Sequence, residues 1–218
     1  AAGYRKLYFE QVYALFENER EDIKKSLFNL GWFPFIEIQG ELFNNLLNAR
    51  SHNSDLKDPI SNIIRYFDNE KITNISSKWW INPIFNDKKK LLIAGIESYN
   101  LDSETGNIAC IKTLATELEG IFRKFHFQNN PKKFSSQTPS SIWISSTERK
   151  ATDKFEPNGL GFPRLFLEFV DEYWFQKNYP NSVSRHSAVH GTANPEAYSR
   201  EKGLQLILIL NQLFYFLN

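Results

Sequence analysis

Two of the four histidines in this 218-residue chain lie in one short segment that also contains an arginine. The segment reads Ser184-Arg185-His186-Ser187-Ala188-Val189-His190-Gly191, and four residues separate Arg185 from His190. Histidine accepts or donates a proton near neutral pH, and arginine carries a permanent charge on a planar fork that matches two phosphate oxygens. Cleavage of RNA without a metal needs a base, an acid and a cation beside the phosphorane. The pairing of Arg185 with His190 therefore suits metal-independent RNA cleavage.

The same residues allow other interpretations, because an Arg-x4-His spacing arises readily by chance. His186 and His190 would share one helical face, as two zinc ligands do. The segment, however, lacks the acid of the His-Glu-x-x-His pattern, and no cysteine or further histidine lies nearby, so we expect no metal and no cofactor. Arg185 could instead bond carbonyl oxygens at a helix end, with His190 as a cap. One chain supplies only one firm acid or base, so we expect a symmetric homodimer to complete a catalytic set.

Helical periodicity surrounds this segment and predicts an all-α fold. The apolar spacing predicts helices over Tyr4–Leu30, Glu41–Ala49, Pro59–Asn69, Leu91–Phe125 (two helices joined near residues 102–107) and Phe162–Phe175. The last helix is expected to begin between Asn194 and Ser199, because Asn194-Pro195-Glu196 combines a cap residue, a first-turn proline and a first-turn acid. Residues 33–38 could form one minor strand or an extended link, and residues 129–141 are typical of a surface loop.

Composition limits the function classes. The chain has 41% hydrophobic and 23% charged residues, which is ordinary for a globular protein. Its net charge, 26 − 25 = +1, gives no global basic field, so any contact with nucleic acid must come from local clusters. The single Cys110 cannot form a disulfide within the chain, which favours a reducing, cytoplasmic setting. The apolar run Leu204–Leu217 is interrupted by polar residues and is too short to span a bilayer, so we expect no membrane association.

The segment from Ser184 to Gly191, followed by Tyr198–Leu204 and an apolar terminal helix, resembles the closing part of bacterial HEPN-domain proteins (higher eukaryotes and prokaryotes nucleotide-binding). Leu118-Glu119-Gly120-Ile121-Phe122 resembles the helix that these proteins place before the motif helix. The resemblance covers roughly residues 87–218 and implies an up-and-down helical bundle, usually dimeric, with Arg185 and His190 lining a cleft between protomers. Residues 1–86 are then an N-terminal helical extension that would serve as a partner or sensor surface.

The resemblance also implies an activity. Many members of the family are metal-independent endoribonucleases in toxin–antitoxin pairs or phage defence, so RNA would be the substrate and an antitoxin or regulatory protein a partner. Arg185 would bind the phosphate, His190 would transfer the proton, and His186 would be a polar helper at the cleft. Glu119 would orient Arg185, although it could equally be an ordinary surface glutamate. Other members are inactive nucleotide- or protein-binding modules, which is the alternative function, and a purely structural helical domain is a third. The toxin branch often has a tyrosine where this chain has Thr192, so we do not expect regulation through that tyrosine.

Two further features could contact nucleic acid. The tandem Trp79-Trp80 could stack on bases, although core packing is the commoner role for such residues. Three basic clusters could follow a phosphate backbone or could simply be solvated surface: Lys88–Lys90, Lys132-Lys133 and Arg149-Lys150.

Overall fold

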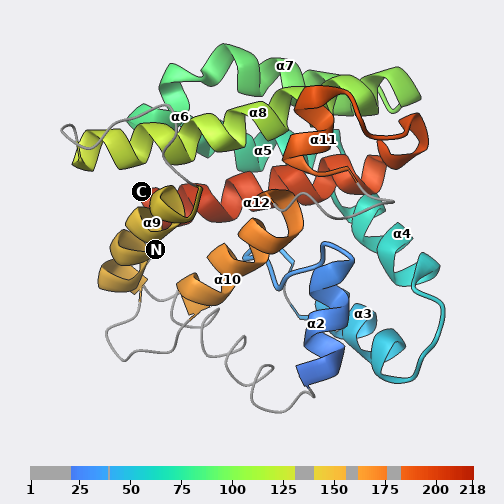
Figure 1. The fold of residues 1–218 in the computed structure, drawn as a ribbon. Helices are drawn as coiled ribbons and strands as arrows, with labels where there is room; N and C mark the ends of the chain where they lie inside the picture. The colour runs from blue at the N-terminus through green and yellow to red at the C-terminus, as the bar shows by residue number, and fades with distance from the viewer. Residues whose placement is uncertain (1–20, 39, 131–139, 156–161, 176–182) are drawn as a thin grey trace. The chain divides into compact units, whose positions relative to one another are not determined.

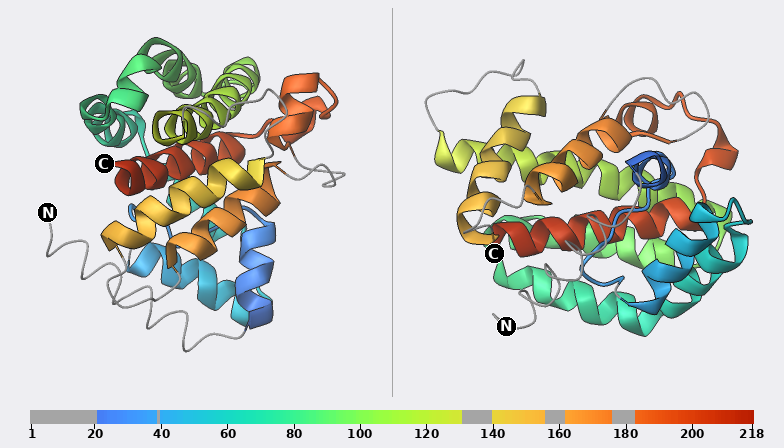
Figure 2. Two further views of the ribbon diagram at one scale, coloured as in Figure 1. Left: turned by 60° about the vertical axis from the view of Figure 1, so that its left-hand side comes forward. Right: turned by 90° about the horizontal axis from the view of Figure 1, so that it is seen from below.

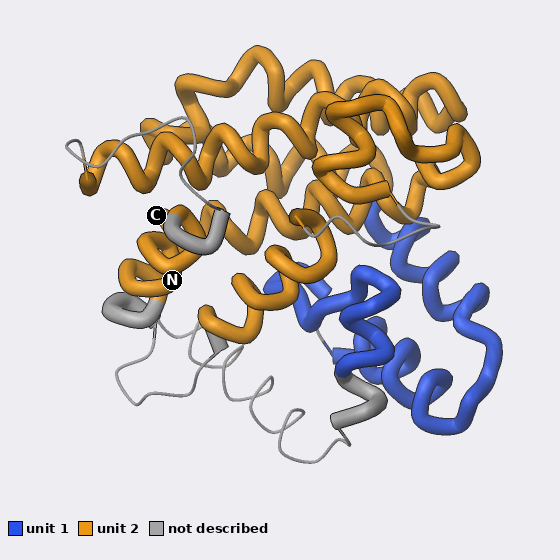
Figure 3. The backbone as a smooth tube through the Cα atoms, in the orientation of Figure 1, with its two compact units in different colours: residues 1–67 blue, residues 68–218 orange. Residues whose placement is uncertain are grey.

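The structure is a computed structural model that describes residues 21–38, 40–130, 140–155, 162–175 and 183–218 (Figure 1). All regular structure in these ranges is helical, which confirms the all-α prediction. Residues 33–38 form turns and irregular backbone, so the minor strand considered for them is absent there. The chain divides into two compact units, Ala1–Phe67 and Asp68–Asn218 (Figure 3).

The first unit contains the described helices α2 (Glu21–Asn29), α3 (Glu41–Ser51) and α4 (Lys57–Tyr66). The predictions at residues 41–49 and 59–69 correspond to α3 and α4. The helix predicted over residues 4–30 is described only from Glu21, and its earlier part lies outside the described residues. Gly31 follows α2 with a φ of 85°, and its N–H donates to the carbonyl of Phe28, so this glycine ends the helix.

The second unit begins with α5 (Asn69–Ser77), the 3₁₀ turn η1 (Lys78–Ile81) and α6 (Pro83–Asp87). Side chains at the caps explain where two of these helices start: Asp68 accepts a hydrogen bond from the N–H of Lys71, and Asn82 accepts one from Ile84. These elements lie almost entirely within residues 1–86, which we expected to form the N-terminal extension. In the structure they belong to the second compact unit, where α5 contacts α7 and α6 contacts α8.

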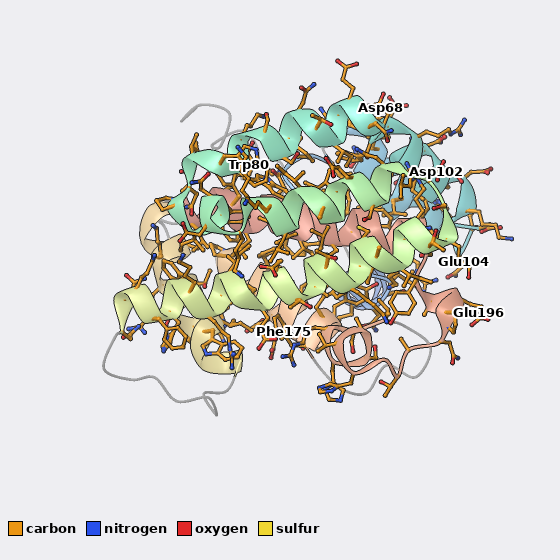
Figure 4. The ribbon with its side chains drawn as sticks, turned by 90° about the horizontal axis from the view of Figure 1, so that it is seen from above. Asp68, Trp80, Asp102, Glu104, Phe175 and Glu196 are labelled. Carbon is orange, nitrogen blue, oxygen red and sulfur yellow. The ribbon has the colours of Figure 1, made fainter. Side chains whose placement is uncertain are left out.

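The helical pair predicted over residues 91–125 is present as α7 (Lys89–Asn100) and α8 (Glu104–Asn129). The turn between them includes Asp102, whose φ of 47° is in the left-handed region, and Ser103 caps α8. Figure 4 shows Asp102 and Glu104 at this turn and Trp80 toward the opposite end of the same helices. The two helices approach closely because Gly95 of α7 leaves room for the side chain of Leu114.

The terminal helix α12 (Arg200–Leu217) lies at the centre of the second unit, with α7 and α8 on one side and α9 (Ser140–Phe155) on the other (Figure 2). The helix α10 (Phe162–Val170) and the π-helical turn η2 (Asp171–Phe175) lie beside α9. Every residue of α12 from Gly203 to Phe214 is buried, so its polar side chains need partners. Asn211 accepts a hydrogen bond from Trp79 and Gln205 accepts one from Tyr173, each at 2.8 Å. Among the described residues, no helix has both the length and the apolar character that crossing a membrane requires.

Candidate functional site

The motif residues form a separate short helix, α11 (Arg185–His190), whose two ends are fixed by local hydrogen bonds. Ser184 caps the start in a reciprocal capping box: its hydroxyl accepts from the N–H of Ser187, whose own hydroxyl accepts from the N–H of Ser184. Gly191 ends the helix with a φ of 69°, and the N–H of Thr192 donates to the carbonyl of Ser187 at 3.0 Å. Gly191 therefore ends the helix, which is limited to six residues.

Arg185 points from α11 toward the middle of α8, where its guanidinium Nη2 forms an ion pair with the carboxylate of Glu119. The Glu119 side chain is 11% exposed and the Arg185 side chain 27%, so the pair is largely shielded from water but still reachable. Ala188, one turn after Arg185, is buried, because α11 packs against α8 and η2. Arg185 and Glu119 are two of the four predicted site residues. The structure brings them together although they are 66 positions apart in the sequence (185 − 119).

Glu119 also contacts a second arginine. Nε of Arg123, one turn later on α8, lies 3.4 Å from the other carboxylate oxygen of Glu119, and the guanidinium carbon lies 4.7 Å from the ring centroid of Trp143 on α9. One carboxylate therefore serves two guanidinium groups, and the three side chains together carry one net positive charge. Sequence reasoning missed Arg123 and Trp143. The spacing of Glu119 and Arg123, four residues apart on a predicted helix, was the available signal for the first.

The two histidines lie together on the other side of α11. The ring centroids of His186 and His190 are 4.4 Å apart, with the ring planes inclined by 50°. His186 is half-buried and His190 is exposed, as is the neighbouring Val189 at 45%. Two imidazoles in contact, one of them exposed, offer nitrogen atoms that can accept or donate a proton.

Arg185 and His190 are close in the chain but face different surroundings. Residues five apart in a helix project about 140° apart around its axis. Arg185 accordingly meets α8, whereas His190 meets His186 and solvent. The guanidinium and the His190 ring make no direct hydrogen bond within the described part of the chain. A substrate strand that contacts both groups would have to lie along α11 and reach from one side of the helix to the other.

Other groups named from the sequence lie elsewhere. Trp79 is fully buried and donates to Asn211, so it is a core residue and cannot stack on a base. Trp80 lies beneath the ammonium group of Lys89, 5.4 Å from the ring centroid. Lys88 is paired with Glu117. Of the remaining basic residues that the sequence singled out, Arg149 is exposed, Lys150 lies over Phe125 at 5.6 Å, and residues 132–133 lie outside the described ranges.

The single cysteine of the chain is buried in α8. Burial raises the pKa of the Cys110 thiol to about 12, which favours the protonated thiol at neutral pH. Among the described residues, no group of three or more histidine, cysteine, aspartate and glutamate side chains could hold a metal ion, and His186 and His190 belong to no such group.

No family model, no curated protein and no solved structure matches this chain. The resemblance to HEPN-domain proteins therefore stays a prediction from the sequence. The two segments from which it was drawn lie in α11 and α8, and Arg185 of the first pairs with Glu119 of the second.

Proposed function

We propose that this protein is a metal-independent endoribonuclease that cleaves RNA by attack of a ribose 2′-hydroxyl on the adjacent phosphate. The observation that supports the proposal is the arrangement on α11: a reachable guanidinium fixed by a shielded carboxylate, and two touching imidazoles on the same six-residue helix. A fixed cation and two proton-transfer groups are the chemical minimum for this reaction without a metal.

In this mechanism the 2′-oxygen forms a bond to phosphorus, the bond from phosphorus to the 5′-oxygen breaks, and no oxidant or cofactor is needed. His190 of one copy accepts the proton of the 2′-hydroxyl, and the same imidazole of the second copy, in its protonated form, donates a proton to the leaving 5′-oxygen. His186, in contact with His190, supports these transfers. Arg185 binds the nonbridging phosphate oxygens, and Glu119 holds its guanidinium in place. The products are a 2′,3′-cyclic phosphate and a 5′-hydroxyl end.

The proposal includes a homodimer. The Arg185 and His190 side chains of one chain point to different sides of α11, so one chain places only one of them against a given side of a bound strand. A second copy would supply the other side chain from the opposite side of that strand. We further propose that the protein acts in a bacterial defence or toxin–antitoxin context, where a regulatory protein would bind it. Sedimentation equilibrium of the purified chain tests the dimer, and a monomer at micromolar concentration would remove this part of the mechanism.

The decisive experiment incubates the full chain with end-labelled, mixed-sequence RNA in excess EDTA. Arg185→Ala and His190→Ala should each reduce the cleavage rate by about 100-fold or more. Arg65→Ala and His52→Ala are matched controls, because both residues are exposed and lie in the first unit. The controls should retain activity within about twofold, a margin that corresponds to roughly 0.4 kcal/mol. Cleavage that stops with EDTA, or that persists unchanged in the two site variants, would refute the mechanism.

The alternative is an inactive module of the same fold that binds a nucleotide or a protein. The observation that favours it is the lack of direct contact between Arg185 and His190. Thermal stabilisation by nucleotides, together with no RNA cleavage at high protein concentration, would identify this alternative.

A further inference from the structure

We infer that Arg123 is a second phosphate contact of the site and binds the RNA strand one phosphate away from the bond that is cleaved. This inference deepens the proposed function and rests on it for the identity of the ligand. Its physical basis is the charge arrangement around Glu119, in which two guanidinium groups share one carboxylate.

The charges around Glu119 do not balance. A single arginine would neutralise Glu119, and the Arg185 guanidinium already pairs with one of its oxygens. Nε of Arg123 approaches the other oxygen at 3.4 Å. Among the described residues, neither this buried Nε nor that of Arg185 has a hydrogen-bond acceptor. The cluster therefore carries one net positive charge that Glu119 does not neutralise, and an anion that reaches the outer guanidinium nitrogens can balance it.

The Arg123 side chain is both accessible and held in a fixed orientation. The Arg123 side chain is 36% exposed, so its outer nitrogens can be reached from solvent. Its guanidinium lies over the face of Trp143, which is only 5% exposed and is thus held by the core. A guanidinium held on an aromatic face keeps its planar fork in a fixed orientation, which suits recognition of phosphate oxygens.

The positions of the two guanidinium groups determine which class of ligand suits them. Because Arg123 and Arg185 contact the two oxygens of one carboxylate, their charged groups lie side by side, and Arg185 is the one carried by the motif helix. A single-stranded polyanion with successive phosphates can engage both groups. A lone inorganic anion can engage them only weakly, because binding to single strands grows with each phosphate contact that releases a counterion.

The test measures binding of the full chain to a 2′-O-methyl RNA dodecamer, which lacks the attacking hydroxyl and is not cleaved. Its affinity is measured by fluorescence anisotropy from 50 to 300 mM salt. Arg123→Met should weaken binding about tenfold at 100 mM salt and reduce the slope of log affinity against log salt by about 0.7, the value for one single-strand phosphate contact. The comparison variant Arg164→Met removes an exposed arginine that pairs with Glu168 four residues later, and it should change neither quantity.

A second variant keeps the test valid if the methionine variant folds poorly. Arg123→Lys preserves the charge but not the fork, so it should retain the salt slope while binding less tightly than the wild type. A salt slope that is identical in the wild type and in Arg123→Met would overturn the inference, as would an absence of any RNA binding. If RNA binds with an Arg123-dependent slope but is never cleaved, the proposed nuclease fails, and Arg123 stands as an RNA phosphate contact with no cleaved bond beside it. If RNA is cleaved with a dependence on Arg185 and His190 but not on Arg123, the proposed nuclease stands and the inference about Arg123 fails.

Discussion

Replacing Glu119 by glutamine tests whether the two-arginine cluster is a real energetic unit. The substitution keeps the shape of the side chain and removes its charge, which leaves Arg123 and Arg185 facing each other without the carboxylate between them. We expect Glu119→Gln to destabilise the second unit, because two shielded guanidinium groups lose their common partner and repel each other.

The size of the effect follows from the exposure of the three groups. Two unit charges 4 Å apart interact by about 4 kcal/mol at an effective dielectric constant near 20, before desolvation is subtracted. Removing one member of a fully buried pair costs roughly 3–5 kcal/mol, whereas fully exposed pairs contribute about 0.2–1 kcal/mol. The side chains here are 11%, 27% and 36% exposed, so they lie between these cases. We therefore expect a loss of roughly 1–3 kcal/mol for Glu119→Gln.

A double-mutant cycle in urea measures the coupling. Four of the five tryptophans lie in the second unit, so their fluorescence reports mainly on its unfolding. Arg185→Met alone should cost less than Glu119→Gln, because Glu119 keeps Arg123 as a partner. The double variant should show a coupling of about 0.5–3 kcal/mol, the range for residues in one ion-pair network. If the losses in unfolding free energy of the two single variants add up to that of the double variant within about 0.3 kcal/mol, the reasoning is refuted. Such additivity is the behaviour of distant, independent sites.

Three further predictions concern the fold around the site. Gly106→Ala should cost about 1–3 kcal/mol in urea unfolding, because the new Cβ would collide with the backbone oxygen of Ser98, whereas Gly120→Ala meets only a flexible lysine end and should cost less. Gly191→Ala should lower stability by about 1 kcal/mol, because the residue has a φ of 69°, and Gly191→Asn should recover part of that loss. Burial lowers the pKa of Lys202 from 10.5 to about 8, so the unfolded state binds more protons between those values and this residue makes stability rise with pH there. Urea midpoints at pH 8 and 9 should show that Lys202→Met lacks this increase.

Strong periodicity allowed much of the fold to be predicted. The pair α7 and α8 appears where apolar residues recur at helical spacing, and the last helix follows the Asn194-Pro195-Glu196 signal after one 3₁₀ turn, η3 (Pro195–Ala197). The helix α9 (Ser140–Phe155) was missed, because its described portion includes the serine-rich stretch at 145–146, which weakens any apolar pattern. One of its buried polar groups, the Ser146 hydroxyl, forms a hydrogen bond with Nδ1 of His126 on α8, and no local rule can foresee such a tertiary contact.

Part of the candidate site could also be predicted from the sequence. The shared helical face of His186 and His190 was expected from their spacing, which depends on residues within a few positions of each other. The capping role of Ser184 was not predicted, although a serine directly before a helix is a common cap. Glu119 was named as a residue that could orient Arg185, and the two do form an ion pair, although the catalytic use of that pair stays a prediction. Trp143 could not be connected to the site from sequence, because its contact with Arg123 depends on how α9 packs against α8.

The shortness of α11 connects stability and chemistry at this site. A six-residue helix is far below the length that is stable by itself in water, so its position depends on its caps and on its contacts with α8 and η2. The Arg185–Glu119 pair is one of those contacts, and it also fixes the guanidinium that would bind phosphate. Loss of RNA cleavage in Glu119→Gln would therefore be ambiguous unless folding is measured alongside it. Arg185→Lys separates the two effects, because lysine can retain the ion pair with Glu119 but cannot offer the bidentate fork to a phosphate. A variant with near-normal stability and about 100-fold lower cleavage would assign Arg185 to the reaction itself, and equal losses in both quantities would assign it to holding the helix.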